Sequence, residues 1–138
     1  MTRTISRLML SALALTFVTA VAVTAESQTD RARLLETKEC GGCDLSSANL
    51  SPKDLSGISA PAAVFSHAIL YRSSLKNADL TGADLSNANL EGADLSGAKL
   101  SGANLDGADL SKATGASFAG AITTSATKCP SGSNGPCQ

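Results

Sequence analysis

Apolar residues recur at every fifth position along most of the chain, a spacing that fits neither regular secondary structure. Seven leucines show it without interruption: Leu80, Leu85, Leu90, Leu95, Leu100, Leu105 and Leu110. On an α-helix five residues advance by about 500°, so these leucines would spiral around the axis. On a strand the odd spacing would send successive leucines to opposite faces. They can share one core only if the chain turns a corner in every group of five residues, as in a solenoid whose coils pack on one another.

The other positions of each pentad fit the same interpretation. We call the leucine the central residue, the residue before it the outward residue, and the one before that the inner residue. The inner residue is alanine in every pentad from Ala78 to Ala108, which leaves room for the leucine. Glycine often stands two places after the leucine, as at Gly82 and Gly92, where a corner favours a residue without Cβ. The outward residues of these pentads are polar, and we expect them to face water.

The unit Ala-(Asp/Asn)-Leu-x-x, repeated from about Cys40 to Lys112, resembles the repeat of the pentapeptide-repeat family. The resemblance implies an all-β solenoid, a right-handed quadrilateral β-helix with four pentads in each coil and one pentad on each face. In that fold outward residues twenty positions apart stack on successive coils, so Asp79 should meet Lys99. Exposed pairs of this kind contribute only about 0–1 kcal/mol each, so we expect them to set the register more than the stability.

Two interruptions of the repeat are expected within the β-helix, which we predict over residues 40–120. Alanine takes the central position at Ala60, within the stretch 58–62, which predicts a loosened face or a small bulge. Later the pattern fails at Gly115 and resumes three residues late at Phe118. This slip predicts the end of the regular coils.

The first 25 residues are typical of a secretory signal peptide. Arg3 and Arg7 form a short basic region, an apolar run from Leu8 to Ala22 follows, and small residues lead to a cleavage site after Ala25. An uncleaved membrane anchor is the alternative, because the run is nearly long enough to span a membrane. Cleavage would leave 9 of the 11 basic residues and all 12 acidic ones, a net charge of −3 (9 − 12). We therefore expect a bacterial protein of the periplasm or the exterior, without stable membrane insertion.

The N-terminal end of the solenoid needs a cover, because an open coil exposes its leucines and its backbone edge. Residues 26–39 predict a short cap helix with Ser27 or Thr29 as its N-cap. Leu34 and Leu35 of this helix would lie over the first coil.

Four cysteines in a small exported chain are typical of structural disulfides. We expect Cys40 to pair with Cys43, both pointing inward from the first coil, and Cys129 to pair with Cys137 in a C-terminal cap over 121–138. With coils about 4.8 Å apart, the two pairs would lie roughly 20 Å from each other. A shared zinc ion, which needs each sulfur at about 2.3 Å, disagrees with that distance. A redox or metal role for Cys40 and Cys43 stays open as an alternative.

The remaining polar residues indicate no enzyme class. His67 is the only histidine, and the serines have no base and orienting acid that the sequence can link to them. The stretch from Gly92 to Lys99 resembles a phosphate loop only superficially, because its glycines recur at corners and no Gly-Lys-Ser/Thr follows. The sequence has no basic stripe, so we expect no nucleic acid as a partner. We expect neither catalysis nor a cofactor nor a bound metal.

One stretch, AVFSHAILYRSSL, departs from the polar outward pattern. Its two outward residues are apolar, and the only tyrosine and an arginine follow, which is the composition of a protein-binding patch. The alternatives are that the cap helix or the loop near Pro61 covers these residues, or that they are scattered on the surface. The residues of this candidate partner patch are Val64, His67, Ile69, Tyr71 and Arg72.

Together these features predict a non-catalytic exported solenoid that serves as a binding or structural module for an unknown protein partner. Some pentapeptide-repeat proteins mimic DNA and protect topoisomerases. The resemblance implies a long, strongly acidic rod in the cytoplasm for that role, unlike this chain. A thiol oxidoreductase that uses Cys40 and Cys43 is the other alternative.

The assignment of inward and outward positions predicts opposite effects for two neighbouring substitutions. Leu90→Asp should unfold the solenoid, because a buried isolated carboxylate costs several kcal/mol and the lost leucine about 2–3 kcal/mol of burial. The total stability of a domain is only about 5–15 kcal/mol. Asn89→Asp should leave the protein folded. Circular dichroism melts test both variants, and equal melting temperatures would show that the assignment is wrong.

Overall fold

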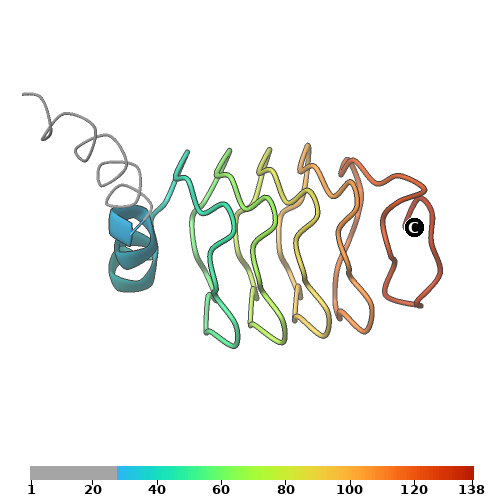
Figure 1. Cartoon of the computed structure of the whole chain (residues 1–138), viewed down its shortest axis with the longest axis horizontal. Helices are drawn as coiled ribbons and strands as arrows, with labels where there is room; N and C mark the ends of the chain where they lie inside the picture. The colour runs from blue at the N-terminus through green and yellow to red at the C-terminus, as the bar shows by residue number, and fades with distance from the viewer. Residues whose placement is uncertain (1–27) are drawn as a thin grey trace, which may run out of the picture.

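A computed structural model describes residues 28–138 as one helix followed by a stack of coils (Figure 1). The helix covers residues 28–37, and the coils lie side by side along the long axis up to the C-terminal segment. The predicted signal peptide over 1–25 lies outside the described residues. Within the described part, β-structure consists of single bridges, because each face of a coil is only one pentad wide.

Parallel bridges join outward residues twenty positions apart as far as Thr114, which confirms the predicted stacking. The central N–H donates to the coil that follows, as from Leu90 to the Asp109 carbonyl at 2.8 Å. The outward N–H donates to the coil that precedes, as from Asn89 to the Ala68 carbonyl at 2.9 Å. The bridges form four columns: a first of Glu39, Ser59, Asp79 and Lys99; a second of Asp44, Val64, Asp84, Asn104 and Ile122; a third of Asn49, Ile69, Asn89, Asp109 and Lys128; and a fourth of Asp54, Ser74, Asp94 and Thr114.

The core is the stack of central residues, as the five-residue spacing predicts. The seven leucines from Leu80 to Leu110 are each at most 2 % exposed. The inner alanines beside them are buried too, apart from the half-buried Ala98. Each turn of the chain therefore adds one layer of leucine and alanine to a continuous apolar interior.

Most corners have a left-handed backbone at their second residue. Gly82 has a φ of 66°, while Asn77 and Arg72 take the same conformation with φ values of 55° and 54°. Glycine adopts this region without steric cost, and asparagine tolerates it better than most residues do. The predicted link between glycine and corners is confirmed.

The outward Asp or Asn also builds the corner that follows it. Its side-chain oxygen accepts the backbone N–H two residues later, as Asp94 Oδ1 does from Ser96 at 3.0 Å. Hydrogen bonds from the hydroxyl and the N–H of that corner residue favour the ionised form, so they lower the pKa of four carboxyl groups. These belong to Asp44, Asp54, Asp79 and Asp94. At Asp109 burial raises the pKa, but hydrogen bonds from Ser111 and Lys128 outweigh it and the pKa is lowered. The repeated acids thus have a structural role.

The corner at Pro52 differs from the others because proline has no N–H and cannot adopt a positive φ. At most corners the N–H at this position donates to a carbonyl of the next coil. Here the corresponding carbonyl, that of Tyr71, accepts the Ser51 hydroxyl at 2.7 Å instead. A serine side chain therefore supplies the donor that proline lacks.

A second serine completes the same corner from within the core. The inner residue after Pro52 is Lys53, whose side chain is exposed. The buried Ser73 hydroxyl donates to the Leu50 carbonyl at 2.8 Å and accepts the Lys53 N–H at 3.3 Å. In other pentads the inner N–H donates directly to the preceding central carbonyl, as from Ala78 to Leu75. Ser73 bridges the two groups that Pro52 keeps apart.

The bulge predicted over residues 58–62 is wrong. Ser59 bridges both Glu39 and Asp79, so the register is kept on this face. Ile58 in the inner place is 1 % exposed, and Ala60 in the central place is fully buried. The two positions have exchanged large and small side chains, so the isoleucine fills the volume that a leucine would otherwise occupy.

The helix covers the first coil with only one of the two predicted leucines. Leu34 is fully buried, but Leu35 is 37 % exposed, so its predicted contact is wrong. Neighbouring helix residues point about 100° apart, and a single face of the helix rests on the coil. Thr29 lies inside the helix rather than at its N-cap, and Ser27 lies outside the described residues.

The register slips near the C-terminus, where the sequence predicts the end of the regular coils. Phe118 takes a central place, since the Ala121 N–H donates to its carbonyl at 3.0 Å as inner residues do elsewhere. The bridge from Asn104 to Ile122 spans eighteen residues instead of twenty. The coil is thereby shortened before the C-terminal segment begins.

Ser73→Ala should destabilise the protein by about 1–3 kcal/mol, because it leaves the buried Leu50 carbonyl and the Lys53 N–H without their partner. Urea unfolding followed by circular dichroism measures this loss. Ser101→Ala, at an exposed corner, serves as the control and should stay within about 0.5 kcal/mol of the parent protein. A loss for Ser73→Ala no larger than that of the control would contradict the bridging role.

The lowered aspartate pKa values predict a loss of stability in acid. The unfolded chain binds protons first, near the ordinary pKa of 3.8, so the stabilisation is complete above that value and is lost as the pH falls through the folded-state pKa. The melting temperature should therefore fall between about pH 5 and pH 2. Asparagine keeps the acceptor oxygen but does not titrate, so replacing all five should flatten the fall. An unchanged pH profile in this variant would contradict the prediction. The five aspartates to be replaced are Asp44, Asp54, Asp79, Asp94 and Asp109.

Candidate binding surfaces of the solenoid

The candidate partner patch lies on the second coil, across two neighbouring faces. Val64 belongs to the second column and Ile69 to the third, where Asn49 and Asn89 stand before and after it. Val64 is half-buried, whereas Ile69 is 42 % exposed. An apolar side chain is thus presented to solvent in a column that is otherwise polar.

The other patch residues stand at the corners on either side of Ile69. His67 is exposed at the corner between the two faces. At the next corner the Arg72 guanidinium carbon lies 5.0 Å from the centre of the Tyr71 ring, within the range of a cation–π contact. Gly92 on the following coil lacks the Cβ that would lie 3.2 Å from Arg72 Cγ, so the arginine stem passes over bare backbone. Among the described residues Arg72 makes no ion pair.

The coils bring two further charged residues to the corner of Tyr71 and Arg72, and the reasoning from sequence missed both. Glu91 stands one coil beyond Tyr71, and Lys112 stands two coils beyond Arg72. Lys112 Nζ donates to Glu91 Oε1 at 2.7 Å. This hydrogen bond and the carboxylate charge raise the pKa of Lys112 above its ordinary value. The signal was present in the twenty-residue period, which places residues 71 and 91, and 72 and 112, in line.

Neither predicted cover lies over the patch within the described residues. The helix rests on the first coil, where the Asp30 carboxylate accepts the Asp44 N–H at 2.9 Å. Lys38, just after the helix, donates from Nζ to the Asp54 carbonyl at 2.6 Å. The stretch near Pro61 forms a corner of the usual kind, with a φ of 56° at the next residue.

Both predicted cysteine pairs are joined in the structure, Cys40 to Cys43 and Cys129 to Cys137. The first pair is buried, as its inward register predicts. Over residues 28–138 no group of three or more His, Cys, Asp or Glu side chains could hold a metal ion. The same part of the chain contains no helix with the length and apolar character needed to cross a membrane.

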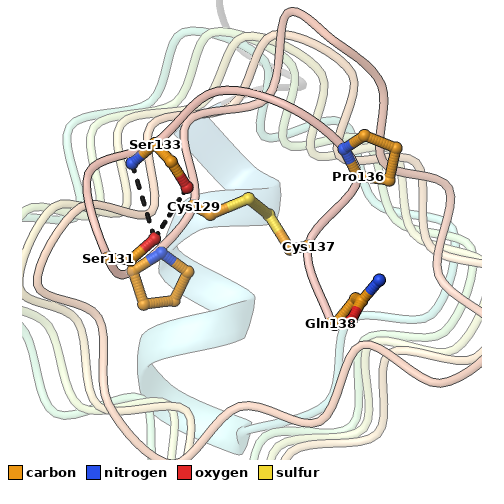
Figure 2. Close-up of a pocket in the computed structure, with 7 residues that line it drawn as sticks. Cys129, Ser131, Ser133, Pro136, Cys137 and Gln138 are labelled. Carbon is orange, nitrogen blue, oxygen red and sulfur yellow. Dashed lines mark hydrogen bonds between the residues drawn. A yellow bond between two sulfur atoms is a disulfide. The ribbon is translucent and has the colours of Figure 1, made fainter.

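The C-terminal end of the solenoid carries a hollow of about 420 Å³ that both cysteines of the second pair line (Figure 2). Viewed from this end, the Cys129–Cys137 bond crosses the interior of the coil outline. Cys129 is 6 % exposed, and Cys137 is half-buried. A second hollow beside it is lined by Phe118 and again by Cys137. The disulfide therefore lies where the next layer of core residues would have been.

The four columns, with a corner every five residues, define a class of protein, the solenoids built of four short faces per coil. The chain matches the family described as "Pentapeptide repeats", with eight copies of the repeat over residues 39–77, 54–87, 78–114 and 88–126. These stretches cover more than half of the sequence, and the chain belongs to the pentapeptide-repeat family, whose members form right-handed quadrilateral β-helices. No curated protein matches the sequence.

Two solved structures are similar to the chain in sequence and fold. A pentapeptide-repeat protein from the thylakoid lumen of Arabidopsis thaliana is 37 % identical, with a TM-score of 0.61, over 66 % of this chain and 65 % of its own. HetL, a pentapeptide-repeat protein involved in heterocyst differentiation regulation in the cyanobacterium Nostoc sp., is 34 % identical, with a TM-score of 0.54, over 70 % of this chain and 51 % of its own. The chain spans just under two thirds of the first protein and about half of the second.

Proposed function

We propose that this protein is an exported, non-catalytic module that binds a protein partner on the lateral surface of its second coil. The exposure of Ile69 within a polar column carries the proposal. Tyrosine and arginine are enriched among the residues that contribute most to binding at protein interfaces, and here they stand beside an exposed apolar side chain. The repeated aspartates, by contrast, are engaged in their own corners.

The patch fits a partner that offers an apolar side chain and a carboxylate close together. The apolar group would lie against Ile69 and Val64, and the carboxylate would pair with Arg72, which has no ion pair among the described residues. Arg72 is already held on the Tyr71 ring and over Gly92. Binding would therefore cost little additional side-chain entropy at this arginine.

Export from the cytoplasm is supported by three independent features. The first 25 residues have the composition of a signal peptide. Two disulfides are formed, which is typical of proteins in oxidising compartments. The related Arabidopsis protein comes from the thylakoid lumen, which is also outside the cytoplasm.

The two other candidate functions have less support. A DNA mimic needs a surface of unpaired acids resembling phosphates, but lysines neutralise acids at four places here, among them Asp79 and Asp94. A thiol oxidoreductase needs an accessible cysteine pair, but Cys40 and Cys43 are at most 2 % exposed. Both observations favour a binding module.

A triple substitution on the outer surface tests the proposal: Val64→Asp, Ile69→Asp and Tyr71→Ser. The folded protein without its signal peptide is used to capture partners from a periplasmic extract of the native host, and the captured proteins are quantified by mass spectrometry. The triple variant should stay folded and lose the partner by about tenfold or more, equivalent to about 1.4 kcal/mol of binding free energy.

A matched control separates the patch from general surface charge. Ile122→Asp changes another exposed apolar residue of the second column, which is 53 % exposed at the last coil, and it should keep the partner. Circular dichroism confirms that both variants are folded. A partner retained equally by the triple variant and the parent protein would refute the patch.

A further inference from the structure

The two disulfides differ in their access to solvent. Cys40 and Cys43 are 0 % and 2 % exposed, and the helix lies over them: Arg33 Nη2 is 2.7 Å from Cys43 Sγ, and Cys40 Sγ is 3.4 Å from the Asp30 carbonyl oxygen. Cys129 is 6 % exposed, but Cys137 is half-buried, and both line the hollow at the open end (Figure 2). A reductant can reach the second pair, while the first requires the helix to move away.

Few contacts other than the disulfide hold the last residues over this end. Residues 127–135 form their own turn, in which the Cys129 N–H donates to the Ser133 carbonyl at 2.8 Å. An antiparallel bridge joins Lys128 to Asn134 within the same turn. Among the described residues, one hydrogen bond joins residues 136–138 to the last coil, from the Cys137 N–H to Thr123 Oγ1 at 3.2 Å. Cleavage of the disulfide would leave this short segment attached by one partly buried hydrogen bond.

We propose that Cys129–Cys137 is a thiol–disulfide exchange site at which a dithiol opens the C-terminal end of the solenoid. A thiolate of the dithiol attacks Cys137 Sγ, the sulfur of the more exposed cysteine, and Cys129 leaves as a thiolate. The second thiolate of the dithiol attacks the resulting mixed disulfide and releases Cys137 as a thiolate. Two electrons and two protons pass to the protein, which becomes a dithiol, while the reductant becomes a disulfide.

Opening uncovers an apolar surface and leaves the coils in place. Phe118 and Cys137 line the second hollow together, so removal of the end segment exposes the phenylalanine further. The coil beneath is held by bonds that do not involve residues 136–138, such as that from the Leu110 N–H to the Lys128 carbonyl at 2.8 Å. The reduced protein is therefore a folded solenoid with an accessible apolar end. This surface is separate from the patch on the second coil.

Graded reduction of the folded protein tests the exchange site. The protein is incubated with increasing dithiothreitol, free thiols are alkylated, and each cysteine is quantified by peptide mass spectrometry. Cys129 and Cys137 should be alkylated at dithiothreitol concentrations about tenfold or more below those needed for Cys40 and Cys43, because access controls the exchange rate. Hydrogen-exchange protection should be lost only in the C-terminal segment beyond about residue 128, and the fluorescence of an apolar dye should rise.

Two variants make the result decisive. Cys129→Ser combined with Cys137→Ser should bind the dye without reductant while its circular dichroism spectrum stays that of the parent. Leu34→Ala loosens the helix and should bring the reduction of Cys40 and Cys43 toward the concentrations that act on the second pair. Reduction of all four cysteines together in the parent, earlier reduction of Cys40 and Cys43, or loss of the coils on reduction would each overturn the proposal.

Discussion

The hydrogen bonds between coils are the constraint on which the other features of this structure depend. The N–H groups of Asn89 and Leu90 donate to opposite neighbouring coils, at 2.9 and 2.8 Å, and the same pair of bonds recurs on every face from residue 59 to residue 95. Two adjacent N–H groups can point in opposite directions along the axis only where the chain is extended. The chain must then turn within the next two residues. This requirement explains the left-handed corners and the alternation of inward and outward side chains.

Because the backbone carries the register, outward side chains are free to vary. Val64 and Ile69 bridge their columns just as the aspartates do, although they cannot accept the corner N–H. The Pro52 corner shows the opposite case, in which the backbone bond is missing and the Ser51 hydroxyl replaces it. A surface patch of unusual composition can therefore be placed on a coil at little cost to the fold. For the same reason, exposed ion pairs such as Lys99 with Asp79 can form along a column although the backbone bonds hold its register.

The repeat made the architecture predictable, because its spacing reports directly on which residues share a core. Leucines from Leu80 to Leu110 occupy the places that the period assigns to them. The exchange of sizes between Ile58 and Ala60 was not predicted, since a search for central leucines registers only the loss at one position and not the gain at the other. The bridging role of Ser73 could not be foreseen either, because it depends on the turn that Pro52 imposes on the preceding coil.

The candidate surfaces were predicted less completely than the fold. The period placed Val64 and Ile69 on adjoining faces, and the structure agrees, but the sequence did not show whether the helix would cover them. Leu35 could not be assigned from sequence, because two adjacent leucines on a short helix leave its rotation undetermined. The pairing of Glu91 with Lys112 required the period to be applied to corner residues as well as to outward ones.

The stacked columns give the molecule a constant repeat along its axis. Successive coils are separated by the spacing of neighbouring strands, about 4.8 Å, and residues in one column pair with each other from coil to coil. Twenty residues added between the helix and the second coil would move the patch along the axis by one step without turning it. The distance between the helix-covered end and any lateral surface can thus change in fixed increments, while the chemistry and the orientation of that surface stay the same.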